Sequence, residues 1–78
     1  MNKVKIYAGM TGEYEIIETN APKEVIIEYI IACSNGTLPD DDPEKFFKQR
    51  GFYIDFLACQ YDDLEIEYDY ELDIYDYF

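Results

Sequence analysis

The chain has 78 residues, with 18 aspartates and glutamates against six lysines and arginines and no histidine, so its formal net charge is -12 at pH 7. This balance excludes the usual binding of nucleic-acid phosphates, which needs clustered Lys and Arg, and docking on an anionic membrane for the same reason. Hydrophobic residues make up 49% of the chain and aromatic residues 18%. That composition is typical of a chain that folds, and the length predicts one small domain spanning residues 1–78.

Targeting and redox signals are few. No apolar run approaches the roughly 18 residues of a membrane span, and no hydrophobic signal region follows the N-terminal lysines. We therefore expect a cytoplasmic protein of a bacterial host cell. Cys33 and Cys59 each follow apolar residues, which predicts free, buried thiols; a disulfide or redox pair is the alternative. Without histidine or a CxxC pair we expect no metal, and we expect no cofactor.

The first elements in chain order are two strands and a helix. Residues 3–8 alternate in polarity, a Gly-containing turn follows, and residues 13–19 are again β-prone, which predicts a hairpin over residues 3–19. Asn20 is a candidate helix cap and Pro22 fits a first turn. A helix over residues 22–34 should follow, ending at the sequence Asn35-Gly36 and lying across a sheet.

A shorter helix and two more strands complete the expected fold. Asp42 is placed to cap a helix over residues 43–50, closed by Gly51. Residues 52–59 are mostly apolar, which predicts a central strand. From Asp63 to Ile74 acidic and apolar residues alternate without a fault, which predicts a long strand with one entirely acidic face.

These elements give the order β-β-α-α-β-β. We expect an α+β domain in which the hairpins 3–19 and 52–74 form one antiparallel sheet, with both helices on one face. The residues expected in its core are Val4, Ile6, Ile26, Ile30, Phe47, Ile54, Phe56, Leu64, Ile66 and Leu72.

Catalysis is not expected. The chain has no histidine base, no Gly-rich phosphate loop and a single serine, Ser34, with no base beside it. Carboxylates are so numerous that no single pair is informative. The acidic run before Pro43 resembles a calcium loop, but Lys45 stands at its sixth position and Gly51 at its twelfth, so a helix cap in a polar linker is the better interpretation.

The alternating acidic segment is the sharpest functional signal. Same-face residues in a strand lie about 6.6–6.8 Å apart, close to the separation of successive phosphates along one nucleic-acid strand, so a stiff row of carboxylates would imitate a phosphate backbone. The alternative is a charged edge strand that prevents aggregation. The candidate partner-binding residues are Asp62, Asp63, Glu65, Glu67, Asp69, Glu71, Asp73, Asp76, Tyr75 and Tyr77, with Asp40, Asp41 and Asp42 as a secondary acidic patch.

A resemblance supports this interpretation. The small, acidic, histidine-free composition resembles the anti-CRISPR and antirestriction DNA mimics of phages and mobile elements, and the opening KIYAGMTGEY (residues 5–14) is similar to the start of the ArdA antirestriction family. The resemblance implies a class of action, the occupation of a nucleic-acid-binding groove on a host nuclease or effector complex. It assigns no residue roles.

The leading hypothesis is therefore a non-enzymatic inhibitor that occupies a basic groove on a CRISPR effector or restriction enzyme. The alternative is an acidic interaction module or small regulatory subunit that docks on a basic partner without mimicking nucleic acid. Under both hypotheses the partner is a basic protein, with no direct contact to nucleic acid or membrane. We expect a monomer or a weak homodimer.

Overall fold

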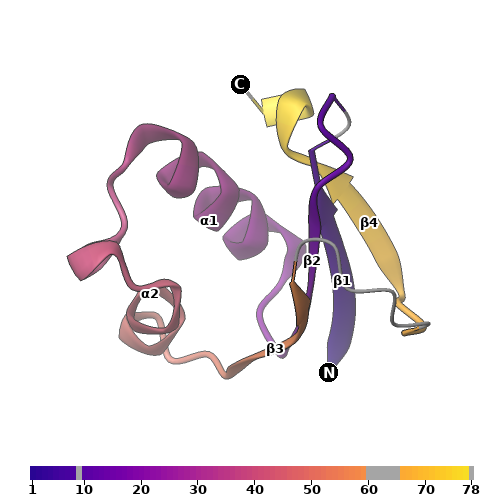
Figure 1. The fold of residues 1–78 in the computed structure, drawn as a ribbon. Coiled ribbons are helices and arrows are strands. Elements are labelled where there is room, and N and C mark those ends of the chain that lie inside the picture. Colours follow the sequence, from indigo (N-terminus) through magenta and orange to yellow (C-terminus); the bar gives the residue numbers. More distant parts are fainter. Residues whose placement is uncertain (9, 60–65, 78) are drawn as a thin grey trace.

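Two helices cover one face of a four-stranded sheet in the computed structural model, which describes residues 1–8, 10–59 and 66–77 (Figure 1). The strand order is β3-β2-β1-β4. In chain order the elements are β1 (Asn2–Tyr7), β2 (Tyr14–Thr19), α1 (Lys23–Asn35), the 3-10 turn η1 (Pro39–Asp41), α2 (Pro43–Gln49), β3 (Ile54–Cys59), β4 (Tyr70–Asp73) and the 3-10 turn η2 (Ile74–Tyr77). The predicted α+β class is confirmed, and the two 3-10 turns are additions to the six expected elements.

The N-terminal hairpin forms as predicted. β1 and β2 pair antiparallel from Asn2 opposite Thr19 to Tyr7 opposite Tyr14. The turn is closed by the Ala8 amide donating to the Glu13 carbonyl at 2.8 Å, and Gly12 has the positive φ of 75° that such a turn requires.

Helix α1 is confirmed, but its expected cap is wrong. The Asn20 side-chain carbonyl accepts a 2.7 Å hydrogen bond from the Tyr53 amide, so it ties the start of β3 to the chain before α1. Pro22 occupies the cap position without a capping side chain. The predicted end of the helix is confirmed. Gly36 adopts the left-handed conformation with a φ of 67°, and the Thr37 amide donates a 2.9 Å hydrogen bond to the Ala32 carbonyl.

Helix α2 begins as the sequence indicates. The Asp42 carboxylate accepts a 3.0 Å hydrogen bond from the Glu44 amide, which satisfies one of the unpaired donors of the first turn. Phe46 and Phe47 are buried and pack with Tyr29 of α1, with ring centroids 5.1 to 5.9 Å apart. This aromatic cluster joins the two helices.

The second predicted hairpin is wrong. β3 pairs only with β2 among the described strands and lies at one edge, so it is not central, whereas β4 pairs parallel to β1 at the other edge and makes the sheet mixed. β3 and β4 therefore run in the same direction, and two parallel strands cannot be joined by a tight turn.

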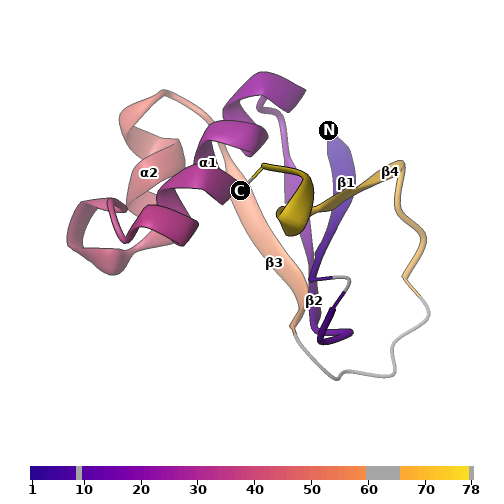
Figure 2. The same cartoon turned by 90° about the horizontal axis from the view of Figure 1, so that it is seen from above.

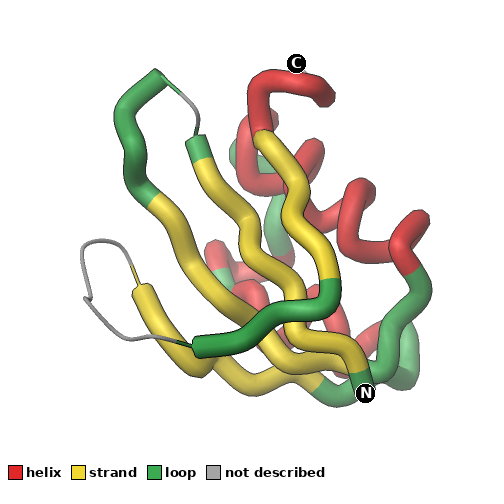
Figure 3. Tube along the Cα trace, turned by 90° about the vertical axis from the view of Figure 1, so that its right-hand side faces the viewer, coloured by secondary structure: helices red, strands yellow, loops and turns green. Residues whose placement is uncertain are grey.

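The long strand over residues 63–74 is also wrong in its described part. Only residues 70–73 are in a strand; residues 66–69 have no regular structure, and residues 63–65 lie outside the described residues. Residues 66–69 cross the face of the sheet opposite the helices (Figures 2 and 3). Alternating polarity suits this crossing as well as a strand, because an extended chain against a sheet also turns alternate side chains toward it and toward water.

The core lies between the helices and the sheet. Seven of the ten expected core residues are buried, namely Val4, Ile6, Ile26, Ile30, Phe47, Ile54 and Leu72. Two are not: Phe56 is 42% exposed, because it lies on the edge strand, and Ile66 is half-buried in the crossing segment. The tenth, Leu64, lies outside the described residues. The thiol of Cys33, expected to be buried, is free but exposed.

Candidate functional site

The face of the sheet opposite the helices is here called the outer face. Three of its strands, β2, β3 and β4, carry four carboxylates on this face. Glu71 and Asp73 of β4 lie beside Lys5 and Tyr7 of β1. At the other side Glu18 of β2 lies beside Asp55 of β3. We call Glu18, Asp55, Glu71 and Asp73 the acidic face.

The evenly spaced acidic row is not formed in the described part of the chain. Of its expected members, Glu71 and Asp73 alone lie on a described strand. Glu67 and Asp69 lie in the crossing segment, and Asp76 is exposed in η2. Asp62, Asp63 and Glu65 lie outside the described residues.

Asp69 has a structural role instead. Its carboxylate accepts a 2.8 Å hydrogen bond from the Lys3 amide, and its own amide donates to the Lys3 carbonyl at 2.7 Å. This pair of bonds fixes the end of the crossing segment to β1 directly before β4. Because its carboxylate is already hydrogen-bonded within the protein, Asp69 is a poor candidate for binding a partner.

Lys5 stands inside the acidic face, surrounded by tyrosines. Its ammonium lies 5.0 Å from the ring centroid of Tyr14, 5.5 Å from that of Tyr68 and 5.8 Å from that of Tyr7. Distances below 6 Å allow cation–π attraction. Tyr68 also donates a long 3.4 Å hydrogen bond to Glu71, the neighbour of Lys5 on β4. The acidic face thus holds a lysine at its centre, whereas the sequence predicted an entirely acidic face.

The negative field of the outer face acts on its tyrosines. Desolvation raises the pKa of Tyr7, and the negative charges of Glu71, Asp73 and Asp76 raise it further. Across the sheet, desolvation and then the charges of Asp55 and Glu18 raise the pKa of Tyr53. Both shifts have the sign expected when carboxylates disfavour a neighbouring phenolate.

The two expected aromatic anchors differ in exposure. Tyr75 is 37% exposed, and its amide donates a 3.0 Å hydrogen bond to the Asp73 carboxylate, which fixes the start of η2. Tyr77 is half-buried and packs against the core. Tyr75 remains a candidate for contact with a partner, whereas Tyr77 has a structural role.

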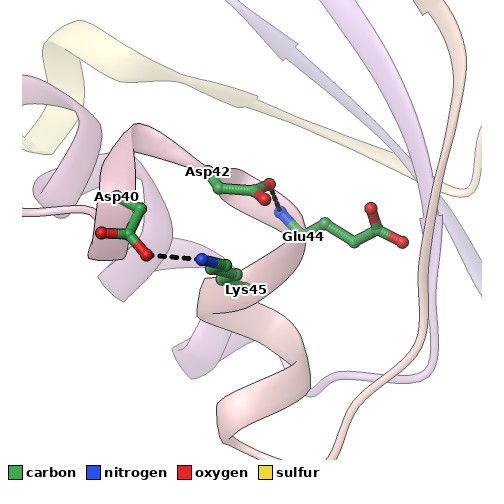
Figure 4. Close-up of polar contacts among 4 residues, drawn as sticks. All are labelled: Asp40, Asp42, Glu44 and Lys45. Carbon is green, nitrogen blue, oxygen red and sulfur yellow. Dashed lines mark hydrogen bonds and ion pairs between the residues drawn. The ribbon is translucent and has the colours of Figure 1, made fainter.

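Two carboxylates of the secondary patch, those of Asp40 and Asp42, bind neighbouring residues of the same region (Figure 4). Asp40 forms an ion pair with Lys45, and Asp42 caps α2. Asp40 and Asp41 both have a φ of 52°, a left-handed conformation that aspartate tolerates better than most residues. Two of the three carboxylates therefore stabilise the α1–α2 connection, as the helix-cap interpretation predicts.

Net charge is divided unequally between the two layers. Residues 20–53, which contain both helices, carry six acidic and four basic residues, whereas the other described residues, which form the sheet, its first turn, the crossing segment and η2, carry nine acidic and two basic residues. The three ion pairs recorded among the described residues, Lys45–Asp40, Lys48–Glu44 and Arg50–Glu28, all lie in the helical layer. Among the described residues, the sheet layer therefore carries most of the net negative charge.

Sequence reasoning missed a group of polar residues under α1. The Tyr29 hydroxyl donates a 2.9 Å hydrogen bond to the Glu15 carboxylate, and Cys33 lies close enough to Tyr29 to interact with its hydroxyl. Burial raises the pKa of Glu15, although the bond from Tyr29 opposes the shift. One feature of the sequence could have indicated this group: Glu15 stands at a core-facing position of its strand, opposite Ile6.

Within residues 1–8, 10–59 and 66–77, no group of three or more Cys, Asp or Glu side chains is arranged to hold a metal ion. None of the described helices is long and apolar enough to cross a membrane. Comparison with protein-family models, with curated proteins and with solved structures finds no match to this chain.

Proposed function

We propose that the protein is a non-enzymatic binding protein whose sheet layer docks on a basic surface of a partner protein. The observation that carries the proposal is the division of charge among the described residues, with nine acidic residues against two basic ones in the sheet layer and a nearly balanced helical layer. Such a distribution attracts and orients a basic partner before contact.

A second candidate function is inhibition of a host defence nuclease or CRISPR effector by occupation of its nucleic-acid groove. Glu71 and Asp73 favour it, because same-face neighbours on β4 keep a separation of about 6.6–6.8 Å. The six-membered row that first suggested phosphate mimicry is absent from the described strands. The inhibitor hypothesis therefore rests on the breadth of the acidic face, not on a regular row.

The test begins with capture of partners from a bacterial lysate on the immobilised protein at low salt. Binding to each identified partner is then compared for two variants that remove four charges each and keep side-chain shape. The acidic-face variant is Glu18→Gln, Asp55→Asn, Glu71→Gln and Asp73→Asn. The matched helical-layer control is Glu24→Gln, Glu28→Gln, Asp41→Asn and Glu44→Gln.

We expect the acidic-face variant to lose most of its affinity and the control to keep it. Equal affinity of both variants would contradict the proposal, because net charge alone would then explain binding. A competition experiment separates the two functions: an inhibitor of the mimic type excludes DNA or RNA from its partner, whereas a docking module binds while nucleic acid stays in place.

A further inference from the structure

The β1–β2 turn and η2 lie at the same end of the sheet (Figure 1). A groove lies at this end, lined by residues of β1, β2 and η2. It consists of two hollows of about 220 and 200 Å³ that share Ile6, Glu15 and Ile74 in their walls. One hollow continues to Tyr7 and Tyr14, and the other continues under α1 to Tyr29, Ile30 and Cys33. Most of the surface of both hollows is apolar, and the shared carboxylate is Glu15.

Glu15 has no cationic partner within the described residues. Its hydrogen bond comes from the Tyr29 hydroxyl, a neutral donor, and Tyr29 itself is only 3% exposed. Arg50, Lys45 and Lys48 are engaged in ion pairs of the helical layer, and Lys5 lies on the outer face. A partly buried carboxylate that lacks a cation is costly, which agrees with the raised pKa of Glu15.

The chemistry that complements this groove is an alkyl chain ending in a cation. The apolar walls suit methylene groups, and Glu15 offers an acceptor for one charged donor. An ammonium fits better than a guanidinium, because Tyr29 already occupies part of the carboxylate and the two-pronged contact of arginine needs both oxygens.

We propose that the groove binds a lysine side chain of the basic partner, with its ammonium on Glu15 and its methylene groups against Ile6, Ile30 and Ile74. This inference rests on the proposed function, because it names the residue that would anchor the partner beside the acidic face. Desolvation inside the groove makes one such contact specific, whereas the carboxylates of the acidic face supply long-range attraction.

The test uses n-butylammonium as the probe and the intact protein, followed by NMR of the isoleucine methyl groups and of the Glu15 carboxyl carbon. We expect saturable shifts at the methyl groups of Ile6, Ile30 and Ile74, together with a lower Glu15 pKa in the presence of the probe. Uncharged n-butanol should bind more weakly, and n-butylguanidinium should not bind better than the amine.

Glu15→Gln should weaken n-butylammonium binding about tenfold or more, the factor expected when a charge-assisted contact is lost. Glu44→Gln is the control, because it removes a carboxylate of α2 that lines neither hollow and should leave the affinity unchanged. Equal affinity in Glu15→Gln, or shifts at outer-face residues alone, would overturn the lysine groove. Circular dichroism establishes that each variant is folded.

Failure of this inference can be told apart from failure of the proposed function. If the amine does not bind but the acidic-face variant loses its partner, the groove is wrong and the docking surface stands. If the amine binds through Glu15 but removal of the four acidic-face charges does not affect the partner, the groove stands as an amine site and the proposed function is wrong.

Discussion

The hydroxyl of Tyr29 in α1 donates a 2.9 Å hydrogen bond to the carboxylate of Glu15 in β2 and so joins the helical layer to the sheet. Because Tyr29 is buried, Tyr29→Phe leaves the ring packing in place and removes only the donor. We expect the free energy of unfolding to fall by about 1–3 kcal/mol, the usual cost of leaving a partly buried charged acceptor without its bond. Urea denaturation at pH 7 measures the change, and Tyr7→Phe on the outer face is the control. No loss of stability in Tyr29→Phe would show that water replaces the hydroxyl at no cost.

The raised pKa of Glu15 predicts a pH dependence of stability. Between the ordinary value of 4.5 and the raised value in the folded protein, the native state binds this proton more readily than the unfolded state does. The contribution of Glu15 to stability therefore increases as the pH falls through the raised pKa, and it is complete below 4.5.

Relief of the overall negative charge acts in the same direction, so the comparison has to be made with Glu15→Gln. We expect the wild-type protein to gain stability relative to Glu15→Gln as the pH is lowered from 7 to about 4.5. Denaturation curves recorded across this range provide the measurement. A constant difference between the two proteins would mean that the pKa of Glu15 is not raised by folding.

The hydroxyl of Tyr7 should lose its proton at a higher pH than that of an ordinary tyrosine, because its pKa is raised. Desolvation is the largest cause of its raised pKa, and Glu71 and Asp73 add to it. Glu71→Gln with Asp73→Asn should therefore lower the pKa of Tyr7 only in part, and added salt should lower it in the same direction. NMR of the Tyr7 ring carbon that bears the hydroxyl follows this titration. Complete return to the ordinary pKa in the double variant would show that desolvation does not contribute.

Lys5 should stabilise the crossing segment through its contact with Tyr68. Lys5→Met keeps most of the aliphatic stem but removes the charge, and we expect a loss of about 1 kcal/mol for an exposed cation–π site. Lys5→Arg should retain most of the stability, because a guanidinium also binds aromatic faces. Thermal denaturation measures both variants.

Lys48→Met is the matched control for this series, since Lys48 contributes only a surface ion pair with Glu44. Its effect should stay below about 0.5 kcal/mol. If Lys5→Met is no more harmful than Lys48→Met, the three tyrosines around Lys5 do not stabilise its charge.

Local sequence determined the elements that depend on near neighbours. The first hairpin, the stop of α1 at Gly36 and the cap of α2 by Asp42 follow from turn chemistry, positive φ and short-range hydrogen bonds. The burial of Val4 and Ile6 in β1 and of Ile26 and Ile30 in α1 also followed from periodicity, because a core-facing side recurs at a fixed interval within one element. The strongly negative charge, and hence the class of partner that it favours, is a property of composition.

Only the tertiary structure decided which strands pair and where the charges gather. Alternating polarity records which side chains face apolar surface, but it does not record whether the chain lies beside another strand or across a sheet. Residues 66–69 lie across the sheet, because β4 pairs in parallel with β1 and these residues cross the outer face to reach it. The same distant pairing puts Glu71 beside Lys5, and the packing of α1 on β2 puts Tyr29 on Glu15. Contacts between residues so far apart in the chain depend on the packing of whole layers, which no local pattern encodes.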